Sequence, residues 1–180
     1  MKKILILQNT ILHYRKPLYN ELSKYYNVTI LHSDEKSIET INNYKEIIVP
    51  VKKIGPFFWQ IGVLKAMRSE HYDVVIAMFD IHWVVNIIAV FFKSHSRFIY
   101  WGHRYSKSWL GNQIRDILMQ ISDGVILYSN AEVDRIISHR VSKFKIFIAP
   151  NTIQVSNFSD GSDLHKDSLL YVGRLQKRKK

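Results

Sequence analysis

The sequence predicts an α/β fold with a Rossmann-like parallel sheet and helices on both of its faces. Short runs rich in Val, Ile, Leu and aromatic residues recur along the chain, and segments with helical spacing of apolar residues separate most of them. Alternation of this kind indicates βαβ units, whose strands are parallel and buried on both sides. The 180 residues, of which 47% are hydrophobic and 23% charged, correspond to a globular chain of about one to one and a half domains.

The predicted strands are short, and each ends at a polar residue, a glycine or a proline. The first follows the N-terminus directly, and its continuous apolar run indicates a strand buried on both faces. The seven predicted strands span residues 3–8, 27–32, 46–49, 74–78, 97–101, 124–128 and 145–148.

The predicted helices fill most of the intervals between these strands. The first begins at Pro17, since proline is tolerated in the first turn of a helix. The last follows Ser129 and Asn130, which are residue types that cap helix N-termini. The other expected helices span residues 57–69, 83–92, 110–122 and 131–138.

Two of these helices have a predicted buried face. In residues 57–69 the spacing of Phe58, Ile61 and Leu64 places them on one side. In residues 110–122 the expected apolar face consists of Ile114, Ile117, Leu118 and Ile121. Residues 83–92 are apolar nearly all round and predict a buried helix.

The composition changes after Asn151. We expect one Rossmann-like domain over residues 1–152 and a linker rich in Ser, Asp and Gly over residues 153–167. Residues 168–180 start a new buried-type strand and then stop in a basic run. A single strand cannot build a core, so we interpret this segment as the truncated start of a second domain.

The chain is basic and contains no cysteine. A formal net charge of +11 favours an anionic partner, such as a phosphorylated ligand, a membrane surface or a nucleic acid. Without cysteine, disulfides, iron–sulfur clusters, thiolate zinc sites and cysteine nucleophiles are excluded. We find no export signal and no apolar run of membrane-spanning length, and expect a cytoplasmic protein.

Ligands of open parallel sheets bind beyond the carboxyl ends of the strands. The polar residues expected in this crevice are Asn9, Arg15, Asp80, Arg104 and Glu132. Four of them have a simpler structural explanation as well. The two arginines are solvated by default, Asp80 is as well suited to cap a helix as to form an acid/base pair with His82, and Glu132 suits the first turn of a helix.

The signatures that usually identify phosphate-binding and metal-dependent enzymes are missing. The sequence contains no G-x-G-x-x-G fingerprint after the first strand, no P-loop, no H-E-x-x-H and no G-x-S-x-G. An Asp-x-Asp pair is missing as well. We therefore expect neither a cofactor nor a metal ion.

Five other segments form a pattern in their order and spacing. They are residues 14–22 after the first strand, 100–103 at the end of the fifth, 122–129 around the sixth, Pro150-Asn151, and 170–175 with Lys179 downstream. Together they resemble the N-terminal, acceptor-side domain of glycosyltransferase family 4, a group of retaining enzymes with the two-domain GT-B fold. The resemblance covers nearly the whole chain, and it implies that residues 168–180 open the donor-binding C-terminal domain.

The resemblance also implies roles for individual residues. His103 matches the histidine that faces the transferred sugar, and Arg174 with Lys179 matches the basic pair that grips the donor's pyrophosphate. Asn151 matches the asparagine of the Pro-Asn-Gly hinge, although Thr152 replaces the usual glycine. The glycines that the family often carries in its first loop are missing here.

The chemistry is consistent with this assignment. Sugar transfer from a nucleotide donor releases a diphosphate that gains charge in the transition state, and cationic side chains held there favour it. Since no Asp-x-Asp metal site is present, Arg174 and Lys179 would supply that charge. A neutral imidazole at His103 can bond a sugar hydroxyl.

The expected partners are a nucleotide-sugar donor and a surface polysaccharide or lipid-linked glycan as acceptor. Phe57, Phe58 and Trp59 beside Lys52 and Lys53 suit contact with an anionic membrane, which would place the protein on the inner face of the plasma membrane. These aromatics are equally suited to covering the sheet.

An alternative function is a non-enzymatic Rossmann-like module that binds a nucleotide or nucleic acid. Single-stranded nucleic acid would require exposed aromatics between basic residues, whereas most aromatics here fall in apolar segments, so we expect no nucleic acid.

Overall fold

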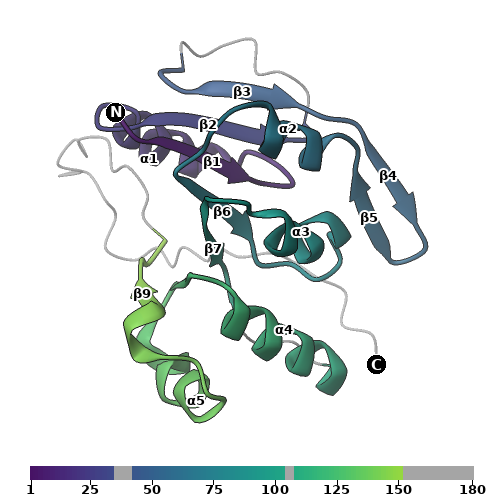
Figure 1. Cartoon of the computed structure of the whole chain (residues 1–180), viewed down its shortest axis with the longest axis vertical. Helices are drawn as coiled ribbons and strands as arrows, with labels where there is room; N and C mark the ends of the chain where they lie inside the picture. Colours follow the sequence, from purple (N-terminus) through teal and green to yellow (C-terminus); the bar gives the residue numbers. More distant parts are fainter. Residues whose placement is uncertain (35–41, 104–107, 152–180) are drawn as a thin grey trace, which may run out of the picture.

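The fold is built on a parallel sheet. The computed structural model describes residues 1–34, 42–103 and 108–151. Seven strands pair in the order β3-β2-β1-β6-β7-β8-β9, and every pair in this sheet is parallel (Figure 1). The predicted fold class is confirmed. The strands are β1 (Lys3–Leu7), β2 (Asn27–His32), β3 (Lys45–Ile48), β6 (Val74–Met78), β7 (Arg97–Trp101), β8 (Gly124–Leu127) and β9 (Ile146–Ile148).

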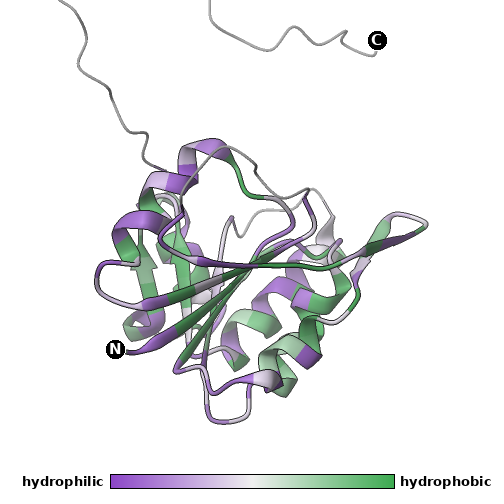
Figure 2. Ribbon diagram, turned by 90° about the horizontal axis from the view of Figure 1, so that it is seen from above, coloured by the Kyte–Doolittle hydropathy of each residue, from purple (hydrophilic) through white to green (hydrophobic). Residues whose placement is uncertain are grey.

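Helices cover both faces of the sheet because its strands are apolar on both faces. In β1, Ile4 and Ile6 pack toward α1, whereas Leu5 and Leu7 pack toward the other helices. Seen from above, the largely hydrophobic strands run between the helices (Figure 2). The helices are α1 (Lys16–Leu22) on one face and α2 (Val63–Ser69), α3 (Val84–Ala89), α4 (Trp109–Ile121) and α5 (Val133–Ser138) on the other.

Short 3-10 turns precede or follow several of these helices. They adjust the entry and exit of the chain where a full α-helical turn does not fit. Their bounds are η1 (His13–Arg15), η2 (Val90–Phe92), η3 (Asn130–Glu132) and η4 (Lys143–Lys145).

The helix predicted over residues 57–69 is wrong in its first half. Residues before and after Gly55-Pro56 form an antiparallel hairpin of β4 (Val51–Ile54) and β5 (Phe57–Gln60), which extends away from the body of the molecule (Figure 2). Only after Gly62, whose φ of +97° favours glycine, does α2 begin. The helical spacing of Phe58 and Ile61 was therefore coincidental.

The predicted apolar face of α4 is rotated from the buried one. Leu118 is buried as expected, but Ile117 is 56% exposed. The buried side includes Arg115 and Met119 instead. This rotation brings a charged side chain under the carboxyl edge of the sheet.

One carboxylate fixes the start of β8 at the opposite, amino edge. Asp123 Oδ2 accepts hydrogen bonds from Lys93 Nζ at 2.7 Å and from the Phe98 backbone N–H at 2.8 Å. Burial tends to raise the pKa of this carboxyl, but the bonds from Lys93 and Phe98 outweigh burial and leave the pKa lowered. Asp123 therefore has a structural role.

Candidate functional site

A cleft lies at the carboxyl ends of the neighbouring strands β6, β7 and β8. It encloses about 390 Å³. It lies next to the point between β1 and β6 where the strand order reverses, and ligands of open α/β sheets bind beyond the carboxyl ends of the strands near such a point. The lining residues are Met78, Phe79, Asp80, His82, Trp101, Gly102, His103, Arg115 and Tyr128.

His103 is held in this cleft by its neighbours on adjacent strands. It follows Gly102, directly after β7, and its ring centroid lies 4.6 Å from that of Tyr128, which follows β8. The side chain of His103 is exposed to the cleft, whereas its backbone carbonyl accepts a hydrogen bond from Arg115 at 3.0 Å. The position predicted for His103 at the carboxyl edge is therefore the one observed.

Arg115 ties two of the strand ends together. Its Nη1 also donates to the carbonyl of Phe79 at 2.7 Å, and its guanidinium lies 4.8 Å from the centre of the Phe79 ring. Burial lowers the pKa of Arg115, while the carboxylates of Asp80 and Glu132 raise it. An arginine in this setting keeps its charge at neutral pH, so the floor of the cleft is cationic.

Arg15 is buried beside the cleft, although a solvated arginine is the default expectation at a loop. Its Nη2 donates to the hydroxyl of Tyr128 at 2.6 Å, and its Nη1 donates to Gln8 Oε1 at 3.2 Å. The guanidinium carbon lies 4.5 Å from the centre of the Trp101 ring. Arg15 therefore supports Tyr128 and Trp101, two lining residues, and is not itself part of the lining.

Asp80 and His82 form the pair that the sequence suggested. Asp80 Oδ1 lies 3.0 Å from His82 Nδ1 and accepts a hydrogen bond from the His82 backbone N–H. A carboxylate only accepts, so Nδ1 carries a proton and Nε2 of the neutral ring is an acceptor. The N-cap of α3 is Trp83, so Asp80 does not cap that helix.

Glu132 occupies the position that its structural explanation predicted, at the end of η3 where α5 begins. Its carboxylate is nevertheless close enough to Arg115 to raise the pKa of that group. Glu132 and Asp80 thus place negative charge near the guanidinium of Arg115.

Asn9 and Asn151 lie at the same edge of the sheet as the cleft but outside its lining. Asn9 Oδ1 accepts from the Thr10 backbone N–H at 2.9 Å, which shapes the loop after β1. Asn151 lines a small hollow with Arg15 and Trp101. The hinge role of Asn151 stays a prediction.

Three predicted site residues, Arg104, Arg174 and Lys179, lie outside the described residues, as do the expected linker and the segment after it. Within residues 1–34, 42–103 and 108–151, the structure contains no group of three or more His, Asp or Glu side chains that would hold a metal ion.

The sequence interpretation missed Arg115 and Tyr128. A signal for Arg115 was present, because it lies three residues before the apolar Leu118 in a helix whose other charged residue is Asp116. A cation at helical spacing with core residues indicates a buried, paired charge. Tyr128 was assigned to the strand itself, and its side chain gave no separate signal.

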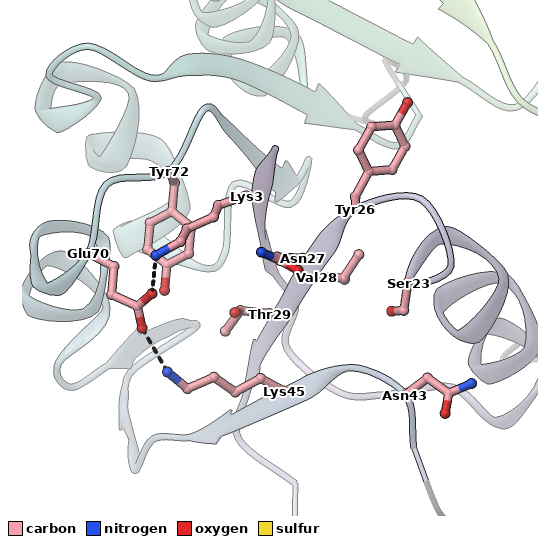
Figure 3. A pocket seen from close by; sticks show the side chains of 10 residues that line it. All are labelled: Lys3, Ser23, Tyr26, Asn27, Val28, Thr29, Asn43, Lys45, Glu70 and Tyr72. Carbon is pink, nitrogen blue, oxygen red and sulfur yellow. Dashed lines mark hydrogen bonds and ion pairs between the residues drawn. The ribbon is translucent and has the colours of Figure 1, made fainter. Parts of the chain in front are cut away.

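A second cavity, of about 330 Å³, lies near the amino ends of β1 and β2 (Figure 3). Its two lysines, Lys3 and Lys45, both pair with the carboxylate of Glu70, at 3.1 and 2.7 Å. Both cations are thus already partnered. The cleft at the carboxyl ends is the better candidate for a site.

None of the helices in the described part of the chain is both long and apolar enough to cross a membrane.

Comparisons with known proteins identify relatives by structure alone. No family model and no curated protein matches the sequence. Among solved structures, HepE from Anabaena in complex with UDP and glucose aligns with a TM-score of 0.58 at 18% identity, covering 84% of this chain and 44% of that one. UDP-GlcNAc 2-epimerase from Methanocaldococcus jannaschii aligns with a TM-score of 0.61 at 17% identity, covering 84% and 46%.

The corresponding epimerase from Rickettsia bellii also aligns with a TM-score of 0.61, at 16% identity. The chain spans less than half the length of each of these proteins. At such low identity the likeness concerns the fold: a Rossmann-like α/β lobe, in support of the GT-B fold type.

Proposed function

We propose that the chain is the N-terminal, acceptor-side domain of a retaining glycosyltransferase of the family 4 type. It would transfer a sugar from a nucleotide-sugar donor to a surface polysaccharide or lipid-linked glycan. The observation that carries the proposal is His103, exposed in the cleft at the carboxyl end of β7 and fixed there by Arg115 and Tyr128. That the structural neighbours include proteins of UDP-sugar chemistry supports it.

In this proposal the bond between the sugar's anomeric carbon and the diphosphate oxygen breaks, and a bond from the acceptor hydroxyl oxygen to that carbon forms. The hydroxyl proton leaves with the departing diphosphate. His103 forms a hydrogen bond with a hydroxyl of the transferred sugar, at the centre where positive charge develops.

The remaining predicted residues have supporting roles. Arg174, Lys179 and Arg104 are outside the described residues. Arg174 and Lys179 would neutralise the diphosphate, and Arg104 would contact the acceptor or donor phosphate. Asp80 and Glu132 bond acceptor hydroxyls at the rim of the cleft. Asn9 and Arg15 shape its β1 side, and Asn151 serves as the hinge toward the donor-binding lobe.

The test uses the protein expressed from its own gene and a panel of nucleotide sugars, with release of nucleoside diphosphate in the presence of glycan acceptors as the readout. A hydrogen-bonding side chain oriented at the reacting centre contributes about a hundredfold or more to the rate. His103→Ala should therefore lower turnover by at least that factor. His95→Ala, an exposed histidine in the turn before β7, is the matched control and should leave turnover unchanged.

Two results would reject the proposal. Normal turnover in His103→Ala would remove this residue from the reaction. A product that is an epimerised nucleotide sugar, formed without any acceptor, would assign the cleft to the reaction named for two of the structural neighbours.

A further inference from the structure

The β4–β5 hairpin has two chemically different faces. Cross-strand partners of an antiparallel pair share a face, and alternate pairs point to opposite sides. Lys53 pairs with Phe58, and Val51 pairs with Gln60, on one face. Lys52 pairs with Trp59, and Ile54 pairs with Phe57, on the other.

The first of these faces is fixed to the body of the protein. The ring of Phe58 stacks on that of Trp83 with centroids 5.0 Å apart, and the Phe58 backbone N–H donates to the carbonyl of His82 at 2.8 Å. Gln60 is buried, and its Nε2 donates to the carbonyl of Gln8 and to Ser33 Oγ. The hairpin is therefore a supported element with a defined orientation.

The other face, which we call the outer face, consists of Lys52, Ile54, Phe57 and Trp59 and is exposed. Ile54 is 57% exposed, Phe57 is 45% exposed and Trp59 is 36% exposed. Burying these side chains against their own sheet would have stabilised the fold, at about 25 cal/mol per Å² of apolar area. A contiguous exposed face of this kind indicates contact with something outside the chain.

The charge around the outer face selects the partner. Residues 50–69 contain Lys52, Lys53, Lys65 and Arg68 and no acidic residue. Lysines attract an anionic lipid surface, and Trp and Phe are the side chains that settle at the level of the headgroups. A protein partner would have to match the apolar centre and the basic rim together, whereas an anionic bilayer supplies both without a specific fit.

We propose that the outer face of the β4–β5 hairpin docks on an anionic lipid bilayer, with Phe57 and Trp59 entering the headgroup region and Lys52 meeting lipid phosphates. The ring of Phe57 lies 6.4 Å from that of His82, a lining residue of the cleft, so docking holds the cleft close to the bilayer. As far as it concerns the acceptor, this inference rests on the proposed function: it selects the lipid-linked glycan over the free polysaccharide.

Vesicle flotation of the chain, without any nucleotide sugar, tests the docking. The chain should float with vesicles of phosphatidylcholine and phosphatidylglycerol, should not float with phosphatidylcholine alone, and should be released by salt. Lys52→Gln should weaken binding about fivefold. Phe57→Ser with Trp59→Ser should abolish it.

The chain offers matched controls at the other edge of the sheet. Phe144, in η4 beside β9, is 95% exposed, and Lys143 next to it is exposed too. Phe144→Ser and Lys143→Gln should bind vesicles like the unmodified chain. Since the outer face makes few contacts with the core, circular dichroism should show that the hairpin variants stay folded.

Lipids with brominated acyl chains locate the inserted residue. They should quench part of the tryptophan fluorescence of the chain. This quenching should disappear in Trp59→Phe and persist in Trp109→Phe. Trp109 is a suitable comparison because it is 75% exposed on α4.

Three results would overturn the docking: no flotation with anionic vesicles, equal flotation of the hairpin variants, or a dimer in light scattering that the same variants dissociate, which would make a second copy the partner. Because no substrate is present, these outcomes are independent of sugar transfer. This chain alone, without a complete donor-binding domain, is expected to be inactive. If it floats as expected while the protein expressed from its own gene turns over no nucleotide sugar, the proposed function is rejected and the docking stands.

Discussion

The guanidinium of Arg115, in the middle of α4, donates a hydrogen bond to the backbone carbonyl of His103, at the end of β7. The same Nη1 atom donates to the carbonyl of Phe79, at the end of β6. One buried cation thus holds the ends of two neighbouring strands together, and this contact fixes the spacing of the strand ends that line the cleft.

Replacing Arg115 by methionine should therefore destabilise the fold. Arg115→Met keeps much of the side-chain volume but leaves the carbonyls of Phe79 and His103 without their donor, which should cost about 3 kcal/mol in the free energy of unfolding. Urea denaturation measures the loss. Arg97→Met, at an exposed arginine, is the control, and equal midpoints for the two variants would show that the Arg115 contacts contribute little.

Gly102 should not tolerate a side chain. A Cβ added there would lie 3.0 Å from Phe79 Cβ, a contact that only a shift of one strand end relieves. Gly102→Ala should lower the free energy of unfolding by about 1–3 kcal/mol because of this overpacking.

Gly55→Ala provides the comparison for Gly102. Nothing lies within 4 Å of a Cβ at Gly55, so its substitution carries only the backbone cost of a φ of +56°, about 1 kcal/mol. Gly102 has a positive φ as well, of +159°, so a larger loss for Gly102→Ala than for Gly55→Ala in thermal unfolding indicates what the contact with Phe79 adds. A smaller loss for Gly102→Ala would argue against overpacking.

Asp123→Asn should lower the free energy of unfolding by about 1–3 kcal/mol. An amide oxygen accepts the hydrogen bonds from Lys93 and from the Phe98 N–H less strongly than a carboxylate does. Glu21→Gln is the matched control, because Glu21 pairs with Lys24 on the exposed surface of α1 and such pairs contribute about 0–1 kcal/mol. Denaturant titration of both variants decides, and a similar small loss in each would assign Asp123 no special role.

The stability of the fold should decrease as the pH falls below about 6.5 because of His32. Burial lowers the pKa of His32, although Glu46 and Asp34 act in the opposite direction. The unfolded chain then takes up a proton before the folded one does, so this contribution is complete above the unfolded pKa and is lost as the pH falls toward the folded pKa, by at most about 1.4 kcal/mol per pH unit.

His32→Asn tests this pH dependence. The Asn Oδ1 can replace His32 Nδ1 as the acceptor for the Asp34 backbone N–H, and it does not titrate. Urea midpoints measured between about pH 5 and pH 7 should fall less steeply in the variant. Parallel curves for the two proteins would show that other groups carry the pH dependence.

The buried strands were predictable because local composition determines them. β6 and β7 have the predicted bounds, since β6 is a continuous apolar run and β7 is apolar and aromatic after Arg97. The parallel topology determines the edge of the sheet at which a ligand binds. The sequence therefore placed His103, Asp80 and Glu132 at the carboxyl edge, where the structure has them.

The hairpin was not predictable, and the spacing of Arg115 indicated a buried charge but not its partners, because distant contacts decide both. Phe57–Gln60 became a strand since Phe58 stacks on Trp83 and Gln60 bonds the loop after β1. The face that α4 buries depends on the carbonyls that Arg115 meets across the sheet. Periodicity within one segment carries no information about such partners.

The buried amide of Gln60 has one more consequence. It joins the base of the hairpin to the carbonyl of Gln8 and the hydroxyl of Ser33, the first residues beyond β1 and β2. The base of the hairpin is thus tied to the loop that leads to Arg15, at the same edge of the sheet as the cleft.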